Sequence, residues 1–254
     1  MKRILLLGAL ALLFWMKTDA QEQRFRLGFQ ASPTFSWLDS DDKFINSSGT
    51  SLGLRLGMRG DYFFAEKYAL TSGIGFGFNQ GGTLLHDTGG ELWPRSDLSN
   101  ESLRVLPDGV KLKYNIRYVE VPFGLKMFTN EIMRDMRFFF EVPVIILGIK
   151  SNAIGDISGA SQTGQNSEDE NIDKDVNLFN LSWGLGGGIE YNVRGSSKGD
   201  TNLFAGFFFN QGFTDVTDDR AVKYVDDGNG NITTEAEDSN GIIRAITIYV
   251  GVMF

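Results

Sequence analysis

The chain has 254 residues, no cysteine, one histidine and a formal net charge of −8 at pH 7. The lack of cysteine excludes a disulfide framework, a thiolate metal centre and a cysteine nucleophile, and one histidine excludes a multi-histidine metal centre. The acidic balance argues against nucleic acid as a partner, because a nucleic-acid binder needs a basic face. What remains is a chain of one large domain's length, with 31 glycines, 21 phenylalanines and only five prolines.

Residues 1–20 have the layout of a secretory signal peptide. Lys2 and Arg3 give a positive start, an apolar run follows over residues 4–15, and the small residues Thr18 and Ala20 precede Gln21. The run is shorter than the roughly 20 residues that a membrane-spanning helix needs. We therefore predict a signal peptide over residues 1–20 and an exported domain over residues 21–254.

The exported domain contains segments in which apolar residues alternate with glycine or polar residues, the pattern of β-strands. Two architectures build a sheet from such segments. A soluble sandwich turns its apolar faces inward, whereas a transmembrane barrel turns them out to lipid. The eight segments lie near residues 25–37, 52–61, 70–78, 111–128, 138–146, 179–191, 203–210 and 245–254.

The polar faces and the connections favour the barrel. The polar faces are rich in glycine, which covers a solvated sheet poorly but suits a crowded barrel interior. The connections near 65–67, 129–134 and 194–201 are short, whereas those near 40–49, 83–109, 152–175 and 216–240 are long, and the two kinds take turns along the chain. Outer-membrane barrels have short periplasmic turns and longer extracellular loops. The sequence predicts an all-β, eight-stranded antiparallel transmembrane up-and-down barrel with long extracellular loops.

Two segments fit this pattern less well. Leu112, Tyr114 and Ile116 are out of phase with the apolar residues that follow them, which predicts either a bulge near residues 117–118 or a strand end above the bilayer. In the fifth segment the alternation predicts a shared outer face, although residues 144–149 are apolar on both faces apart from Gly148. That predicted outer face consists of Phe138, Phe140, Val142, Val144 and Ile146.

The chain ends in a strand-like segment whose apolar residues alternate back from a terminal phenylalanine. Such an ending is similar to the assembly signal that outer-membrane barrels present to their insertion machinery. The residues concerned are Ile248, Val250, Val252 and Phe254.

Three stretches resemble the PorT-like family of small outer-membrane barrels, a porin family typical of the Bacteroidota. Residues 118–126 resemble its signature Tyr-x-Glu-(Ile/Val)-Pro-Leu-x-x-Lys, and residues 184–191 and 210–216 are similar to its sixth strand and to the end of its seventh, with Asn210 and Gln211 departing from the pattern. The resemblance implies an outer-membrane location and an eight-stranded barrel. It implies little about biochemistry, because most members have no assigned activity; the namesake takes part in type IX secretion.

The inward positions of these strands carry four cationic and four anionic residues. Charges in so narrow a barrel must pair, because an isolated buried ion costs several kcal/mol. We expect a salt-bridge network that fills the lumen and fixes strand register; the alternative is a path for protons or small ions. The predicted network consists of Arg26, Arg55, Arg59, Asp61, Glu120, Lys126, Glu141 and Glu190.

The loops hold most of the acidic residues, but their pattern suggests no metal site. The best calcium candidate, residues 226–231, lacks the glycine and the bidentate glutamate of a calcium loop and resembles a hairpin turn between Val225 and Ile232. His86, beside Asp87 and Thr88, is the sole histidine for catalysis, and a lone loop histidine is more often a solvated surface residue. We predict no catalytic residue, no metal and no cofactor.

We therefore expect a non-enzymatic outer-membrane barrel, a structural or binding module whose acidic loops contact a ligand or an envelope protein. Two alternatives remain: a narrow porin-like channel for small solutes or ions, and an accessory subunit of an envelope secretion or assembly complex. An enzyme that uses His86 is a third. The expected partners are outer-membrane lipid, the barrel insertion machinery and an envelope protein, and not nucleic acid.

Overall fold

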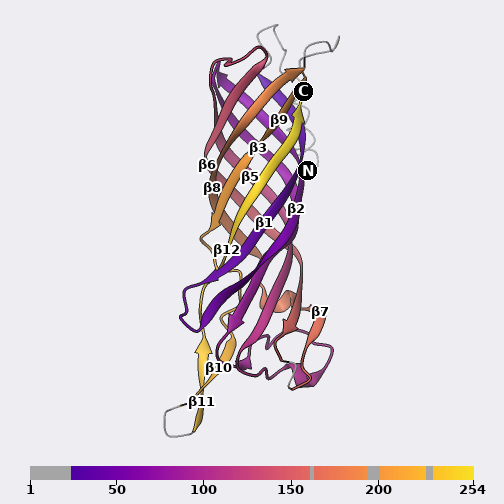
Figure 1. The fold of residues 1–254 in the computed structure, drawn as a ribbon, viewed down its shortest axis with the longest axis vertical. Helices are drawn as coiled ribbons and strands as arrows, with labels where there is room; N and C mark the ends of the chain where they lie inside the picture. Colours follow the sequence, from indigo (N-terminus) through magenta and orange to yellow (C-terminus); the bar gives the residue numbers. More distant parts are fainter. Residues whose placement is uncertain (1–23, 161–162, 194–200, 227–230) are drawn as a thin grey trace, which may run out of the picture.

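The computed structural model describes residues 24–160, 163–193, 201–226 and 231–254. Eight long strands in this part of the chain form a closed antiparallel ring (Figure 1). Each strand pairs with the next along the ring, and the last pairs with the first. This confirms the predicted eight-stranded barrel. In ring order the strands are β1 (Phe25–Ser40), β2 (Ile45–Ala65), β3 (Tyr68–His86), β5 (Val110–Phe128), β6 (Met136–Ser158), β8 (Phe179–Val193), β9 (Thr201–Gly212) and β12 (Gly241–Met253).

The two ends of the barrel differ, and we call them the short-turn end and the loop end. Residues 66–67 and 129–135 join strands at the short-turn end, where the carboxyl terminus also lies (Figure 1). The third predicted short connection, near 194–201, falls largely on residues outside those described, as does the predicted signal peptide. Residues 87–109, 159–178 and 213–240 join strands at the loop end.

The first connection at the loop end is shorter than the sequence suggests. We expected a long loop near residues 40–49, but only residues 41–44 join β1 to β2. Both strands continue beyond the apolar segments: residues 38–40 of β1 pair with β12, and residues 45–50 of β2 pair with β3. The prediction was wrong because it ended the strands where the apolar alternation ended, whereas ladder hydrogen bonds need only the backbone.

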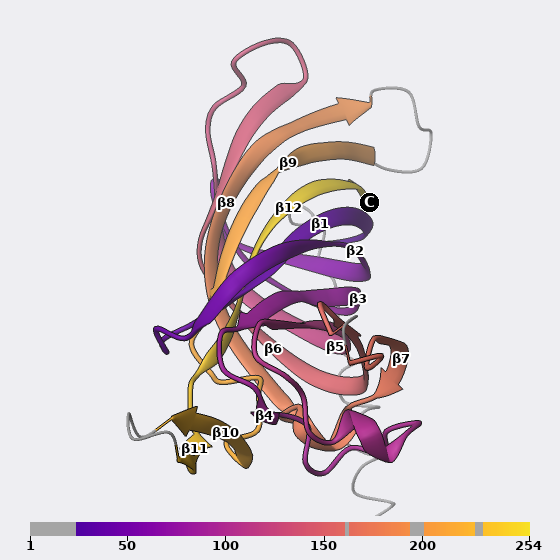
Figure 2. The same cartoon turned by 60° about the horizontal axis from the view of Figure 1, so that its bottom comes forward.

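Smaller elements lie at the loop end. β4 (Gly90–Glu91), β10 (Ala221–Asp226) and β11 (Ile232–Glu237) form a three-stranded sheet, and β7 (Ser167–Asn171) pairs with the end of β6. β10 and β11 lie apart from β7 around this end (Figure 2). Two single turns of 3₁₀ helix, η1 (Glu101–Leu103) and η2 (Asp173–Asp175), complete the loops. No helix in the described part of the chain is long and apolar enough to cross a membrane.

Side chains alternate between the outer and inner walls of the barrel. Large apolar residues such as Phe29, Met58 and Phe76 project outward and are about half exposed, while their sequence neighbours face inward and are buried or half-buried. Exposure of so large an apolar belt to water would be unfavourable. A transmembrane barrel has such a belt on its outer wall, where it faces lipid.

β5 keeps one facing along its whole length. Leu112, Tyr114 and Ile116 are buried on the same inner face as Glu120 and Lys126. The irregularities lie in the neighbouring ladders, where the register shifts between Gly77 and Gln80 of β3 and beside Arg117–Tyr118. Inner apolar side chains are favoured here because the strand has left the apolar belt and its outer side faces water.

β6 corrects the predicted facing of its middle. Val144 and Ile146 are buried inside rather than exposed with Phe138 and Phe140. The pairing with β8 shifts register between Glu141 and Val144, at Pro143, which has no N–H for the ladder. The bulge exchanges the two faces, so residues 144–149 are apolar on both: one set faces the lumen and the other, Ile145, Leu147 and Ile149, faces outward.

Candidate functional site

The eight ionisable residues predicted for the lumen all face the interior, where none is more than 8 % exposed. They come from five strands, β1, β2, β5, β6 and β8. Each occupies an inward position because its strand alternates strictly at that point. The ring closure then brings strands that are distant in sequence to the same height of the lumen.

Six of these residues form one ionic cluster towards the short-turn end. Lys126 lies at its centre: its Nζ is 2.9 Å from Asp61 Oδ2, 3.8 Å from a Glu190 oxygen and 3.9 Å from a Glu141 oxygen. Two arginines complete the cluster around the carboxylates. Arg26 Nη1 donates to Glu190 Oε1 at 2.7 Å, and Arg59 Nη2 lies 2.5 Å from Glu141 Oε1.

The other two predicted residues form a separate pair nearer the loop end. Arg55 Nε lies 3.1 Å from Glu120 Oε2. Arg55 Nη1 also donates to Asn210 Oδ1 at 3.1 Å and to Thr247 Oγ1 at 3.0 Å. Arg55 thereby joins β2 to β5, β9 and β12 across the lumen.

Arg137 belongs to the ionic cluster but was missed by the sequence analysis. Its Nη2 donates to Glu190 Oε1 at 2.6 Å, and its guanidinium lies 4.0 Å from the centre of the Phe128 ring. Arg137 precedes Phe139 and Glu141 at the same inward parity on β6, so the alternation contained the signal. With Arg137 the cluster has four cations and three carboxylates.

Aromatic rings surround the cations of the cluster. Lys126 Nζ lies 5.0 Å from the ring centre of Phe128, 4.7 Å from that of Phe139 and 5.6 Å from that of Phe204. Cation–π attraction and the ion pairs together offset the cost of removing the Lys126 ammonium group from water. The sequence analysis treated phenylalanine mainly as a lipid-facing residue, and so it missed these inner rings.

A second aromatic layer lies nearer the loop end. The rings of Phe208 and Tyr249 stack, with centroids 5.4 Å apart and planes 10° apart. Phe208 rests on the glycines of β8: a Cβ at Gly184 would lie 2.5 Å from Phe208 Cζ, and one at Gly186 would lie 2.6 Å from Phe208 Cδ2. These glycines therefore leave the space that the ring fills.

Two cavities adjoin these layers. A small one of about 30 Å³ lies beside Tyr249 and the Arg55–Glu120 pair, and its lining is mixed, with apolar residues such as Val144 and Ile146 beside the polar ones. A larger one of about 600 Å³ opens at the short-turn end, and we call it the vestibule. Its lining includes Arg24, Arg26, Lys67, Arg137 and Glu190, so the ionic cluster forms its floor.

The lumen is closed at the loop end by an apolar plug. Trp93, from the loop between β3 and β5, inserts into the extended strands and donates from Nε1 to the Tyr114 hydroxyl at 3.2 Å. Their rings meet edge to face, with centroids 5.7 Å apart. Gly155 accommodates the indole, because a Cβ there would lie 2.5 Å from its Cη2. The plug also contains Leu38, Ile45, Leu84, Leu112, Ile116, Ile157, Ile172 and Ile243.

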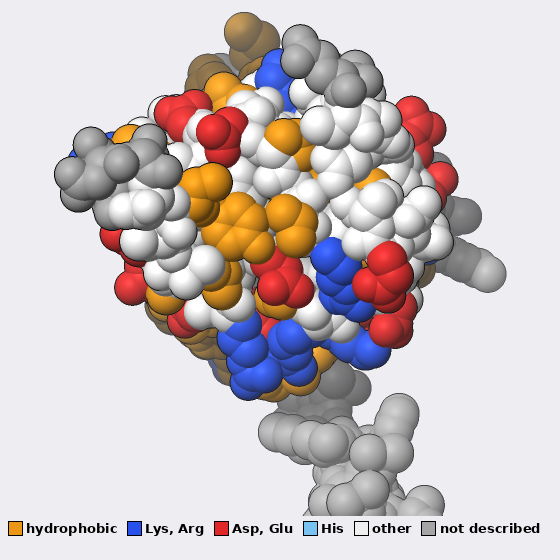
Figure 3. All heavy atoms as spheres, turned by 90° about the horizontal axis from the view of Figure 1, so that it is seen from below, with side chains coloured by type: hydrophobic (Ala, Val, Ile, Leu, Met, Phe, Trp, Pro, Cys, Tyr) orange, Lys and Arg blue, Asp and Glu red, His pale blue; other side chains and the backbone are white. Residues whose placement is uncertain are grey.

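Figure 3 looks onto the loop end and shows a patch of hydrophobic side chains near the middle of the face, set among uncharged side chains and backbone, with acidic and basic side chains mostly around it. Arg95 pairs with Asp218 there at 2.6 Å, and Lys174 pairs with Asp97 at 2.8 Å. Among the described residues no group of three or more His, Asp or Glu is arranged to hold a metal; most of the candidate calcium turn lies outside them.

His86 is not the solvated loop residue that we expected. It ends β3 and is only 4 % exposed, and no hydrogen bond to its Nε2 is present. Burial lowers the pKa of the imidazole from 6.5 to about 4, against the opposing effect of Asp42. The side chain therefore packs in the wall of the barrel at the loop end.

The last strand places its alternate residues on the outer wall. Val250 and Phe254 are each 51 % exposed, and Ile248 and Val252 have the same outward parity. The backbone of Phe254 continues the ladder through two hydrogen bonds with Leu27, of 2.7 and 3.2 Å. The terminal residue therefore extends the pairing of β12 with β1, which closes the ring.

A ring of eight antiparallel strands, with an apolar outer belt and a lumen filled by paired charges, defines a small transmembrane β-barrel. The family model "Outer membrane protein beta-barrel domain" matches residues 19–218. The chain belongs to this family and is an outer-membrane barrel; its short-turn end therefore faces the periplasm and its loop end the exterior.

The chain is similar at low identity to several solved outer-membrane proteins. Neisserial surface protein A is 9 % identical, with a TM-score of 0.40 and coverage of 91 % of this chain and 96 % of that chain. Ail of Yersinia pestis is 9 % identical, with a TM-score of 0.34 and coverage of 91 % and 97 %. The protease OmpT of Escherichia coli is 10 % identical, with a TM-score of 0.33 and coverage of 94 % and 99 %. No curated protein matches the sequence.

Proposed function

We propose that the protein is a non-enzymatic outer-membrane barrel that does not conduct and that presents a binding platform outside the cell. The observation that carries this proposal is the filling of the lumen. The ionic cluster, the Phe208–Tyr249 layer and the apolar plug follow one another along the barrel. An eight-stranded barrel is just wide enough for side chains to fill it, and these three groups of side chains occupy the lumen at successive heights.

The loop end supports the second half of the proposal. The strands extend beyond the apolar belt, enclose the plug around Trp93, and carry the sheet of β4, β10 and β11. Loops that served only to connect the strands would not need to pack around a hydrophobic core. Rigid elements hold a binding surface more accurately than free loops do. We propose an envelope protein or a surface ligand as the partner of this platform.

Conductance in planar bilayers tests the closed lumen. We expect the full chain to insert without steady current, with insertion verified by the heat-dependent shift on gels. A steady ohmic current would overturn the proposal and favour the narrow channel, the alternative that the ionisable groups within the membrane support. A change of that current in Glu120→Gln would then locate the path.

Cross-linking in native outer membranes tests the platform. We expect a partner to be captured by the full chain and lost when residues 221–237, which include β10 and β11, are replaced by a short glycine–serine turn. Unchanged capture would show that this sheet makes no contact. If the captured protein belongs to a secretion or assembly complex, the PorT-like resemblance of residues 118–126 extends to an accessory role in that complex.

Processing and assembly complete the proposal. Residues 1–20 act as the signal peptide and residues 21–254 form the outer-membrane domain, so amino-terminal sequencing of the purified protein begins at Gln21. The insertion machinery recognises the last strand through Ile248, Val250, Val252 and Phe254. Their outward positions make them accessible to a membrane-embedded receptor.

A further inference from the structure

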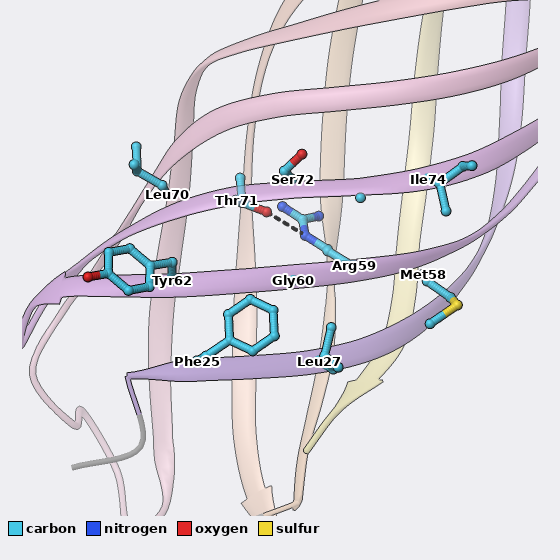
Figure 4. A pocket seen from close by; sticks show the side chains of 11 residues that line it. Phe25, Leu27, Met58, Arg59, Gly60, Tyr62, Leu70, Thr71, Ser72 and Ile74 are labelled. Atoms are coloured by element: carbon cyan, nitrogen blue, oxygen red, sulfur yellow. Dashed lines mark hydrogen bonds between the residues drawn. The ribbon is translucent and has the colours of Figure 1, made fainter. Parts of the chain in front are cut away.

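A shallow apolar groove lies on the outer wall of the barrel near the short-turn end (Figure 4). It crosses β1, β2 and β3 and has a volume of about 460 Å³. Figure 4 shows large apolar side chains on each of the three strands around it. These are Phe25 and Leu27 of β1, Met58 and Tyr62 of β2, and Leu70 and Ile74 of β3.

The groove exists because two small residues are neighbours on the outer face. Gly60 and Ser72 are direct cross-strand partners, and each interrupts a row of large outward side chains on its own strand. Gly60 is also opposite Leu27. The position of the gap is therefore set by the register of β2 against β3. The Phe25 ring and the Leu27 side chain form its near wall, because a Cβ at Gly60 would lie 3.2 Å from Phe25 Cζ and 3.5 Å from Leu27 Cδ2.

The lining of the groove is suited to a hydrocarbon chain as its occupant. The two short polar residues of the lining are already engaged: the Ser72 hydroxyl donates to the carbonyl oxygen of Pro122 at 3.0 Å, and the Thr71 hydroxyl accepts from Arg59 Nε at 3.1 Å. The barrel ring is closed, so β1, β2 and β3 have partners on both sides and offer no free edge to a peptide strand. An occupant must gain its binding energy from apolar contact alone.

The position of the groove along the barrel axis indicates which leaflet of the membrane surrounds it. Tyr62 and Phe25 lie at its end nearest the turn at residues 66–67, and tyrosine is enriched where the hydrocarbon meets the headgroups. The short turns face the periplasm, where the leaflet consists of glycerophospholipid. We propose that this groove is a binding site for one acyl chain of a periplasmic-leaflet glycerophospholipid.

Photochemical labelling tests the site. The full chain is reconstituted with phosphatidylethanolamine that carries a diazirine on its acyl chain, irradiated and digested. We expect labelling to concentrate on residues 58–62 and 70–74. In Gly60→Leu, which fills the gap, labelling of these residues should fall about tenfold, corresponding to about 1.4 kcal/mol of binding. Phe25→Ala, which removes one wall and leaves the ladder intact, should lower it as well.

Ala205→Leu is the matched control, because it enlarges an exposed outward residue of β9, which lies three strands from β2 around the ring and outside the groove. It should leave the labelling of the groove unchanged. Heat-dependent gel shifts verify that each variant is folded. Uniform labelling around the barrel, equal labelling in Gly60→Leu, displacement by lipopolysaccharide but not by phospholipid, or a cross-linked second copy in place of lipid would each overturn the proposal.

Discussion

At the scale of single residues, Glu190 pairs with three cations of the ionic cluster, as many as Asp61 does. It accepts from Arg26 at 2.7 Å and from Arg137 at 2.6 Å, and it lies 3.8 Å from Lys126. A buried ion pair adds little net stability, but the loss of one partner leaves its counter-charges without compensation. The fold therefore depends on the balance of the ionic cluster more than on any one pair.

Glu190→Gln should lower the free energy of unfolding by about 3–5 kcal/mol, because it leaves four cations facing two carboxylates. Urea unfolding in liposomes, followed by gel mobility, measures the change. Glu168→Gln, at an exposed position of β7, is the control and should have almost no effect. Adding Arg137→Gln should recover part of the lost stability, because it removes one of the excess cations. If the double variant is no more stable than Glu190→Gln, the loss does not come from the charge balance of the ionic cluster.

Asp215, at the loop end, should make the stability of that end depend on pH. Its Oδ1 accepts from the Thr217 hydroxyl and the Gly241 N–H, both at 2.7 Å. Burial raises the pKa of the carboxyl from 3.8 to about 6, against the hydrogen bonds from Thr217, and Asp219 adds to the rise. Between these pH values the folded state binds more protons than the unfolded state. This contribution to stability is therefore present at low pH and lost as the pH rises through about 6.

Asp215→Asn should remove this dependence while keeping an acceptor oxygen. The test compares protease resistance of the loop end in the wild type and in Asp215→Asn between pH 4 and 8. The comparison is needed because the lowered pKa of His86 makes stability fall towards acid pH in both proteins. The wild type should lose resistance relative to the variant as the pH rises. Parallel profiles would show that Asp215 does not titrate in this range.

At the scale of elements, the loop end folds around one side chain. Trp93 is 2 % exposed and contacts Tyr114, and Gly155 makes room for it. The strands hold the membrane part by backbone hydrogen bonds, whereas the loops depend on this core. The two parts should therefore respond separately to a change in the plug.

Trp93→Ala should destabilise the loop end by about 3–5 kcal/mol through the cavity that it leaves. We expect trypsin to cleave the loop between β3 and β5, at Arg95 or Arg104, while the heat-dependent gel shift of the barrel persists. Trp183→Ala removes an outward indole of β8 and should leave this loop resistant. Loss of the gel shift in Trp93→Ala would show instead that the plug and the membrane part unfold together.

At the scale of the whole molecule, closure depends on the last strand. β12 pairs with both β9 and β1, so the ring forms only when the carboxyl-terminal segment is in place. Phe254 is the outermost residue of that closure and projects toward lipid.

Phe254→Ala should reduce the amount of folded barrel in the outer membrane several-fold, with the remainder degraded in the periplasm. Membrane fractionation and the gel shift measure both pools. Phe213→Ala is a matched control, because Phe213 is 53 % exposed and lies in a loop-end connection. Equal yields of the two variants would exclude a special role of the terminal phenylalanine in assembly.

Much of the architecture could be predicted because strand facing is a local property. A period of two assigns each residue to a wall, and this placed Arg26, Lys126 and Glu190 inside from the sequence alone. The same rule failed at Val144, because a bulge at Pro143 shifts the phase by one residue. It also failed at the first loop, where backbone pairing continued without apolar side chains.

The sequence by itself determined the eight strands, their facing and the identity of most lumen charges. Each of these follows from the alternation of apolar and polar residues, which is a local property of each strand. Only the tertiary structure decided which charges meet, because Arg26 and Glu190 are 164 residues apart and come together through ring closure. It also decided that His86 is buried, that Trp93 closes the loop end, and that Gly60 lies beside Ser72. Each of these depends on contacts between strands or loops that no local pattern encodes.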